Sequence, residues 1–89
     1  MFKSGDKIGV PCQVKPGPFE GEQLISFDTL NGPISGFVLN SEIMERGAKY
    51  YVRAVIDSIN DDVLTVWVNG SFFNTNGVAT ISPETALAA

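Results

Sequence analysis

The sequence contains no histidine and only one cysteine, Cys12. Histidine is the usual general base near neutral pH, so a nucleophile with a base and an orienting group is hard to build here, although lysine or aspartate can also act as a base. One cysteine forms neither an intramolecular disulfide nor a zinc site, which favours a reducing compartment. Cys12 occupies an apolar position of a strand pattern, and we interpret it as a buried structural thiol.

Long apolar runs are also missing. No stretch approaches the roughly 18 apolar residues of a membrane span. The N-terminal residues become polar at Lys3, without the apolar core of a signal peptide. We therefore expect a soluble, cytoplasmic protein with no membrane contact.

Basic residues are absent from the last part of the chain. All six lie at or before Arg53, and only acidic charges follow in a chain of net charge −4. Surfaces that bind phosphate groups normally need clustered lysine and arginine. Duplex DNA is therefore not an expected partner, and the acidic surface favours solubility.

The patterns that are present indicate strands. The chain of 89 residues is 44% hydrophobic, enough for one domain with a thin core. Period-two alternation or a high content of β-forming residues predicts six strands, at residues 7–14, 22–30, 34–39, 49–59, 63–68 and 78–81. The strand at 63–68 is rich in β-formers throughout, as in a strand covered on both faces. Turn signals recur about every ten residues, which is typical of a barrel or sandwich.

Helical signals are short. Asn40 or Ser41 can cap a turn that runs through Met44 and ends at Gly47. Ser82 is a candidate N-cap for a second short helix. We predict an all-β fold: a small five- to six-stranded barrel with one short helical turn. Residues 1–82 form the domain, and 83–89 form a C-terminal tail or short docked helix. The predicted core includes Val52, Ile56, Val66 and Phe37.

One segment resembles a known family. Gly36-Phe37-Val38-Leu39-Asn40-Ser41-Glu42-Ile43 resembles the Gly-Leu-Val-His-Ile-Ser-Glu-Leu segment of the RNA-binding repeats of a bacterial ribosomal protein, and the similarity of pattern extends over residues 36–68. Leu39 stands where the family has histidine. This resemblance implies an oligonucleotide/oligosaccharide-binding barrel. Gly5-Asp6-Lys7-Ile8 and the glycine-aromatic-valine strand after it also resemble Src-homology-3-like barrels, so both barrel kinds stay open.

Aromatic pairs mark the candidate binding residues. Adjacent strand residues point to opposite faces, so one member of Phe72-Phe73, and one of Tyr50-Tyr51, should be exposed. Exposed aromatic side chains are enriched at interfaces. The leading hypothesis is a non-catalytic binding or accessory module that contacts a protein partner through these four residues.

Two alternatives remain. The first is a weak single-stranded RNA-binding domain, in which aromatic rings stack on bases and basic groups meet phosphates. Its residues would be Lys15, Phe27, Phe37 and Arg53. The second, more distant alternative is an enzyme with a site that lacks histidine. We interpret Asp61-Asp62 as a solvated turn and expect neither cofactor nor metal. The oligomeric state is left open.

Overall fold

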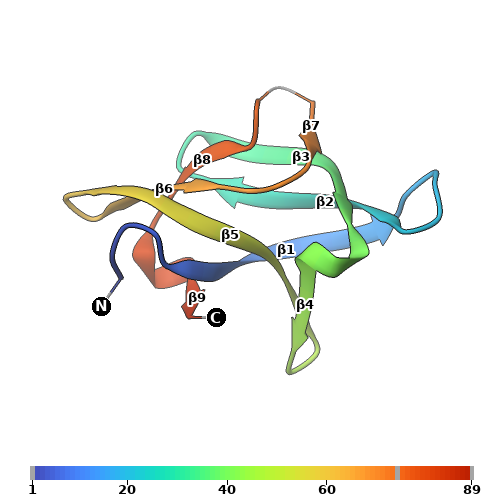
Figure 1. Cartoon of the computed structure of the whole chain (residues 1–89), viewed down its shortest axis with the longest axis horizontal. Helices are drawn as coiled ribbons and strands as arrows, with labels where there is room; N and C mark the ends of the chain where they lie inside the picture. The colour runs from blue at the N-terminus through green and yellow to red at the C-terminus, as the bar shows by residue number, and fades with distance from the viewer. Residues whose placement is uncertain (1, 74, 89) are drawn as a thin grey trace.

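The computed structural model describes residues 2–73 and 75–88, and these form nine strands and two 3-10 turns. The strands belong to one strongly curled sheet that forms a half-barrel (Figure 1), which confirms the all-β class. The strands are β1 (Lys7–Pro16), β2 (Glu22–Thr29), β3 (Gly32–Leu39), β4 (Ile43–Arg46), β5 (Lys49–Asn60), β6 (Val63–Trp67), β7 (Ser71–Phe72), β8 (Val78–Ile81) and β9 (Leu87–Ala88). The 3-10 turns are η1 (Asn40–Glu42) and η2 (Pro83–Thr85). No helix in these residues has the length and hydrophobicity required to span a membrane.

Six of these strands correspond to the six that the sequence predicts: β1, β2, β3, β5, β6 and β8. The three additional strands are short, and each adds to a longer one: β4 to β5, β7 to β3, and β9 to β1. Two to four residues are too few to show a period-two pattern, so these strands carry no recognisable signal in the sequence.

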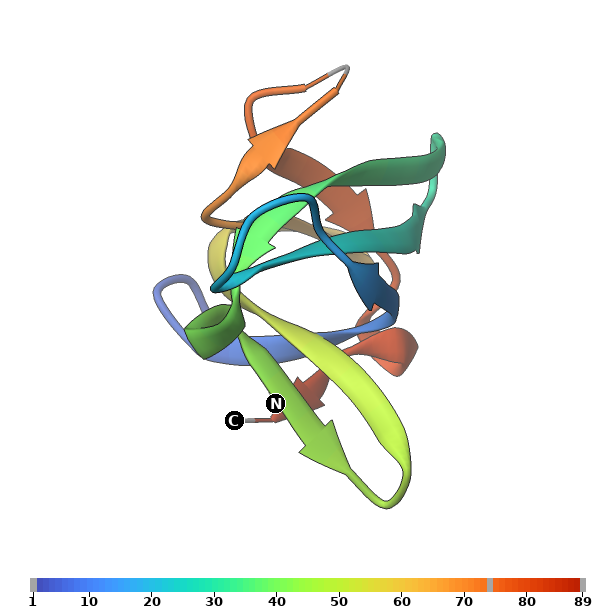
Figure 2. The same cartoon turned by 90° about the vertical axis from the view of Figure 1, so that its right-hand side faces the viewer.

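The long strands are arranged as a Greek key. β1, β2 and β3 are consecutive antiparallel neighbours, and β5 returns to lie beside β1, in the order β3-β2-β1-β5. β1 is shared between two parts of the sheet, because residues 7–12 pair with β5 and residues 13–16 pair with β2. The sheet curls around a single interior (Figure 2).

The segment after β6 brings the two ends of the sheet together. The chain leaves β6, pairs as β7 with Gly36 and Phe37 of β3, and returns as β8 beside β6. The backbone N–H of Leu30, in the β2–β3 turn, donates to the carbonyl of Thr80 in β8 at 2.9 Å. These contacts link β3 and the β2–β3 turn, at one end of the sheet, to the segment that follows β6 at the other end.

The core is aliphatic apart from Phe27, and it includes three of the four residues predicted for it. Val52, Ile56 and Val66 are buried, as predicted, whereas the prediction for Phe37 was wrong. Phe37 is half-buried on the outer face of β3, because it alternates with the buried positions Gly36 and Val38. The buried hydrophobic residues are Ile8, Val10, Ile25, Phe27, Val38, Val52, Ala54, Ile56, Leu64, Val66, Val68, Ala79 and Ile81.

The predicted helical turn is shorter than expected. It ends at Glu42, and the residues that follow form β4, which pairs with residues 49–52 of β5. Backbone pairing with β5 therefore replaces the predicted second half of the turn. Gly47 and Ala48 connect β4 to β5, and this hairpin projects from the barrel in both views (Figures 1 and 2).

Two other segments differ from their predicted bounds or type. The strand predicted at residues 34–39 begins earlier, at Gly32. The β2–β3 turn consists of Leu30 and Asn31, and Gly32 pairs with Thr29 with a φ of 104°, a conformation that glycine adopts readily. Ser82 is the N-cap of η2, so its start signal leads to a single 3-10 turn and not to a longer helix. After η2 the chain forms β9, which pairs with Ile8 and Gly9 of β1. The domain limit at residue 82 stays a prediction.

Candidate functional site

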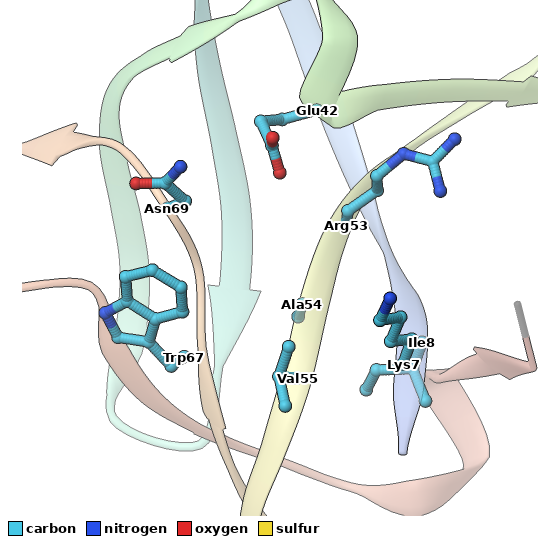
Figure 3. A pocket seen from close by; sticks show the side chains of 8 residues that line it. All are labelled: Lys7, Ile8, Glu42, Arg53, Ala54, Val55, Trp67 and Asn69. Carbon is cyan, nitrogen blue, oxygen red and sulfur yellow. The ribbon is translucent and has the colours of Figure 1, made fainter. Parts of the chain in front are cut away.

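A groove lies on the outer face of the barrel, where β1, β5 and β6 run side by side (Figure 3). Its volume is about 250 Å³, and it is lined by Lys7, Ile8, Glu42, Arg53, Ala54, Val55, Trp67 and Asn69. We call it the Trp67 groove. Val55 lies at the centre of the groove because of the strand register. It pairs with Lys7 of β1 on one side and with Trp67 of β6 on the other.

Trp67 is 45% exposed although it lies in a central strand. Leu64, Val66 and Val68 are buried. The expectation that residues 63–68 are covered on both faces was therefore wrong. Sequence reasoning missed Trp67 for this reason. The signal was available, because Leu64, Val66 and Val68 occupy alternate positions and the intervening Trp67 then faces outwards.

Charged and polar groups surround the groove. Lys7 and Arg53 come from β1 and β5, Glu42 from η1, and Asn69 from the residues after β6. The Arg53 Nε donates to the carbonyl oxygen of Ser41 at 3.2 Å, which ties this side chain to the turn that carries Glu42. Figure 3 shows the Glu42 side chain directed into the space between Asn69 and β5. The lining thus has two cations, one carboxylate and one amide.

A second surface lies on the outer face of β2 and β3. Lys15, Leu24 and Phe37 are successive pairing partners across β1, β2 and β3. The rings of Phe37 and Phe73 are 5.7 Å apart at an interplanar angle of 78°, an edge-to-face arrangement. Phe73 is 61% exposed and Leu39 is 52% exposed. We call Leu24, Phe37, Leu39 and Phe73 the apolar patch.

Comparisons with protein-family models, with curated proteins and with solved structures found no match.

The four aromatic residues predicted to bind a partner do not form one surface. Phe73 belongs to the apolar patch, whereas Phe72 is half-buried and packs against the core, its ring 6.2 Å from that of Phe27. The two thus lie on opposite sides, as predicted. Tyr50 lines a separate hollow, and Tyr51 lies beside Gly9 and Met44.

The four RNA-binding candidates are likewise dispersed. Phe27 is 3% exposed, so its ring is not accessible for base stacking. Phe37 belongs to the apolar patch and Lys15 lies at its margin, while Arg53 lines the Trp67 groove. Lys15 lies six residues along β1 from Gly9, the pairing partner of Arg53, a separation of up to about 20 Å in an extended strand.

The other titratable residues considered from the sequence lie in a turn or against the core. Asp61, with a φ of 54°, and Asp62 connect β5 to β6. The described residues contain no group of three or more side chains suited to hold a metal ion. Cys12 packs against the core, and burial raises the pKa of its thiol from 9.0 to about 11. The thiol is therefore protonated and weakly nucleophilic at neutral pH.

Proposed function

We propose that this protein is a non-catalytic binding or accessory module of the cytoplasm that contacts a protein partner through the apolar patch. The observation that carries the proposal is Phe73, which is largely exposed and packs edge-to-face on Phe37. A contiguous exposed apolar surface is typical of an interaction site, whereas isolated exposed apolar residues are not.

The geometry of the patch favours a protein partner. Aromatic side chains are enriched among the residues that dominate interface energetics, and a side chain already restrained before binding loses less conformational entropy. Phe37 is restrained by β3, and the backbone N–H of Phe73 donates to the carbonyl of Ser35 at 3.1 Å.

The charges around the patch support the same choice. Lys15 is at one margin, while Glu22 is the pairing partner of Leu39 on the same face. The margin is therefore of mixed sign, whereas a surface that follows a nucleic-acid backbone is predominantly basic.

The barrel we propose is of the oligonucleotide/oligosaccharide-binding kind. That fold is a partly open Greek-key barrel, and the order β3-β2-β1-β5 is a Greek key. The short η1 turn after β3 and the limited contact between β7 and β3 also support this choice. The RNA site of Lys15, Phe27, Phe37 and Arg53 has less support, because these side chains lie on separate surfaces or in the core.

Protein capture tests the proposal. The tagged protein is used to capture partners from cell extract with and without nuclease, and recovered proteins are identified by mass spectrometry. We expect a partner that nuclease treatment leaves bound and that Phe73→Ser releases. Phe73 is largely exposed, so the variant should stay folded, which thermal unfolding checks.

Leu30→Ser is the matched control. Leu30 is 55% exposed and lies in the β2–β3 turn, seven residues along the chain from Phe37. It should retain the partner. A partner lost on nuclease treatment, or retained by Phe73→Ser, would contradict the proposal.

A further inference from the structure

We propose that the Trp67 groove binds a guanine nucleotide, with the base against Trp67 and the phosphate between Lys7 and Arg53. This site is separate from the apolar patch and does not depend on the protein partner proposed above. The proposal follows from three features of the groove: an exposed indole, two cations on adjacent strands, and a carboxylate with an amide at one end.

The indole provides a surface for stacking. Trp67 lines the groove beside Val55, its pairing partner in β5. A Cβ built on Gly77 would lie 3.5 Å from the Trp67 Nε1, so one edge of the ring lies near the backbone of Gly77. Stacking of a base on an aromatic side chain is a major source of affinity for unpaired nucleotides.

The cations are placed for a phosphate. Lys7 pairs with Val55, and Arg53 is two residues before Val55 in β5, so the two are diagonal neighbours on one face. Diagonal neighbours in an antiparallel pair lie roughly 7–8 Å apart at the backbone. Both side chains are long, and because the Arg53 Nε donates to the Ser41 carbonyl oxygen, its terminal N–H groups are the ones that would meet a phosphate beside Lys7. Hydrogen bonds between ionised groups are the strong ones.

The polar end of the groove selects the base. A carboxylate has two acceptor oxygens, and an amide has both a donor and an acceptor. Guanine alone among the four RNA bases has two adjacent donors on its pairing edge, the ring N1–H and the exocyclic amine, with a carbonyl oxygen next to them. Glu42 would accept from both donors, and Asn69 would donate to the carbonyl oxygen, as in recognition of unpaired bases by their Watson–Crick edges.

Either a free nucleotide or a single-stranded RNA can present this chemistry. Intrinsic fluorescence distinguishes them directly, because Trp67 is the only tryptophan in the chain. The full chain is titrated with 5′-GMP, with 5′-UMP, and with the pentanucleotides UUGUU and UUUUU. Isothermal titration calorimetry of the same ligands provides an independent measure of binding.

We expect saturable quenching by GMP and at least about tenfold weaker binding of UMP, the effect of losing hydrogen bonds to a charged group. UUGUU should bind more tightly than UUUUU by a similar factor. Tighter binding of UUGUU than of GMP would identify RNA as the source, and equal binding would identify the free nucleotide. Equal binding of GMP and UMP, or no saturable binding of either, would overturn the proposal.

Variants separate the roles. Glu42→Gln should remove most of the preference for GMP over UMP, whereas Glu45→Gln, a matched change on β4 outside the groove, should keep it. Lys7→Gln should weaken both nucleotides and reduce the dependence of binding on salt. Phe73→Ser should leave GMP binding unchanged, so failure of this proposal and of the protein-partner proposal are distinguishable. Retention of the GMP preference in Glu42→Gln would overturn the assigned role of this carboxylate.

Discussion

Ile56 shows how a single side chain contributes to stability in so thin a core. It is 1% exposed on the inner face of β5. Its backbone N–H donates to the carbonyl of Asp6 at 2.9 Å, and its carbonyl accepts from the N–H of Gly5 at 2.7 Å. The same residue therefore packs the barrel interior and anchors the segment that precedes β1.

Ile56→Ala should lower the free energy of unfolding by about 2–5 kcal/mol, because buried apolar atoms are removed and a cavity remains. Equilibrium denaturant unfolding measures the change. Ile59→Ala is the matched control, because Ile59 lies in the same strand but is 39% exposed. A loss under about 1 kcal/mol for Ile56→Ala would contradict the assignment of Ile56 to the core.

Ala48 adopts an unfavourable backbone conformation. Its φ is 68°, in the left-handed region that non-glycine residues seldom adopt. We expect Ala48→Gly to raise the free energy of unfolding by roughly 0.5–1 kcal/mol, because relief of this strain outweighs the larger entropy loss of glycine on folding.

The neighbouring glycine provides the control for that change. Gly47 has a φ of 56° and open space around it, so Gly47→Ala adds strain without a steric clash. It should lower the thermal midpoint, while Ala48→Gly should raise it. A lower midpoint for Ala48→Gly would show that the turn does not hold Ala48 in the left-handed region.

At the scale of elements, β7 depends on a close approach to β3. A Cβ built on Gly36 would lie 2.5 Å from the Ser71 carbonyl oxygen and 2.7 Å from the Phe72 Cα. Both are backbone atoms, so a side chain at position 36 must displace β7. The glycine at the start of the resemblance segment thus has a steric role, and the residue after β7 is Phe73 of the apolar patch.

Gly36→Ala should therefore destabilise the protein by about 1–3 kcal/mol, the usual cost of overpacking. It should also accelerate hydrogen exchange in β7 relative to β5, and weaken capture of the protein partner. Ser35→Ala, at the adjacent position, is the control and should change none of these properties much. Unchanged exchange in β7 for Gly36→Ala would contradict the close approach.

At the scale of the whole molecule, net charge opposes binding to nucleic-acid backbones. The chain carries −4, and the groove places only two cations together. A guanine paired in a duplex also has its pairing edge occupied, so a groove that selects this edge does not read duplex DNA.

We expect mixed-sequence duplex DNA to bind no more tightly than roughly 10⁻⁴–10⁻⁶ M at physiological salt, the range of non-specific binding. Fluorescence anisotropy with a labelled duplex measures this affinity. Submicromolar binding at physiological salt would contradict this expectation.

Local pattern was sufficient for the long strands and for much of the inner face. Alternation in β5 predicted that Val52 and Ile56 point the same way, because side chains in a strand alternate whatever the strand packs against. Turn residues separated the six long strands for a similarly local reason. Where both faces of a strand carry apolar and polar residues, alternation did not decide which face is buried. Phe27 and Phe37 were both read as candidates for stacking, yet one is in the core and the other is on the surface.

Tertiary structure alone decided which distant residues meet. Lys7, Arg53 and Trp67 are far apart in the sequence and share a groove because β5 pairs with both β1 and β6. Pairing between strands distant in sequence depends on closure of the whole sheet, which no local segment encodes. The sequence by itself thus determined the all-β class and the long strands through local alternation. The strands β7 and β9, the placement of Phe73 beside Phe37, and the meeting of Lys7 with Arg53 and Trp67 arose only from pairing between strands distant in the sequence.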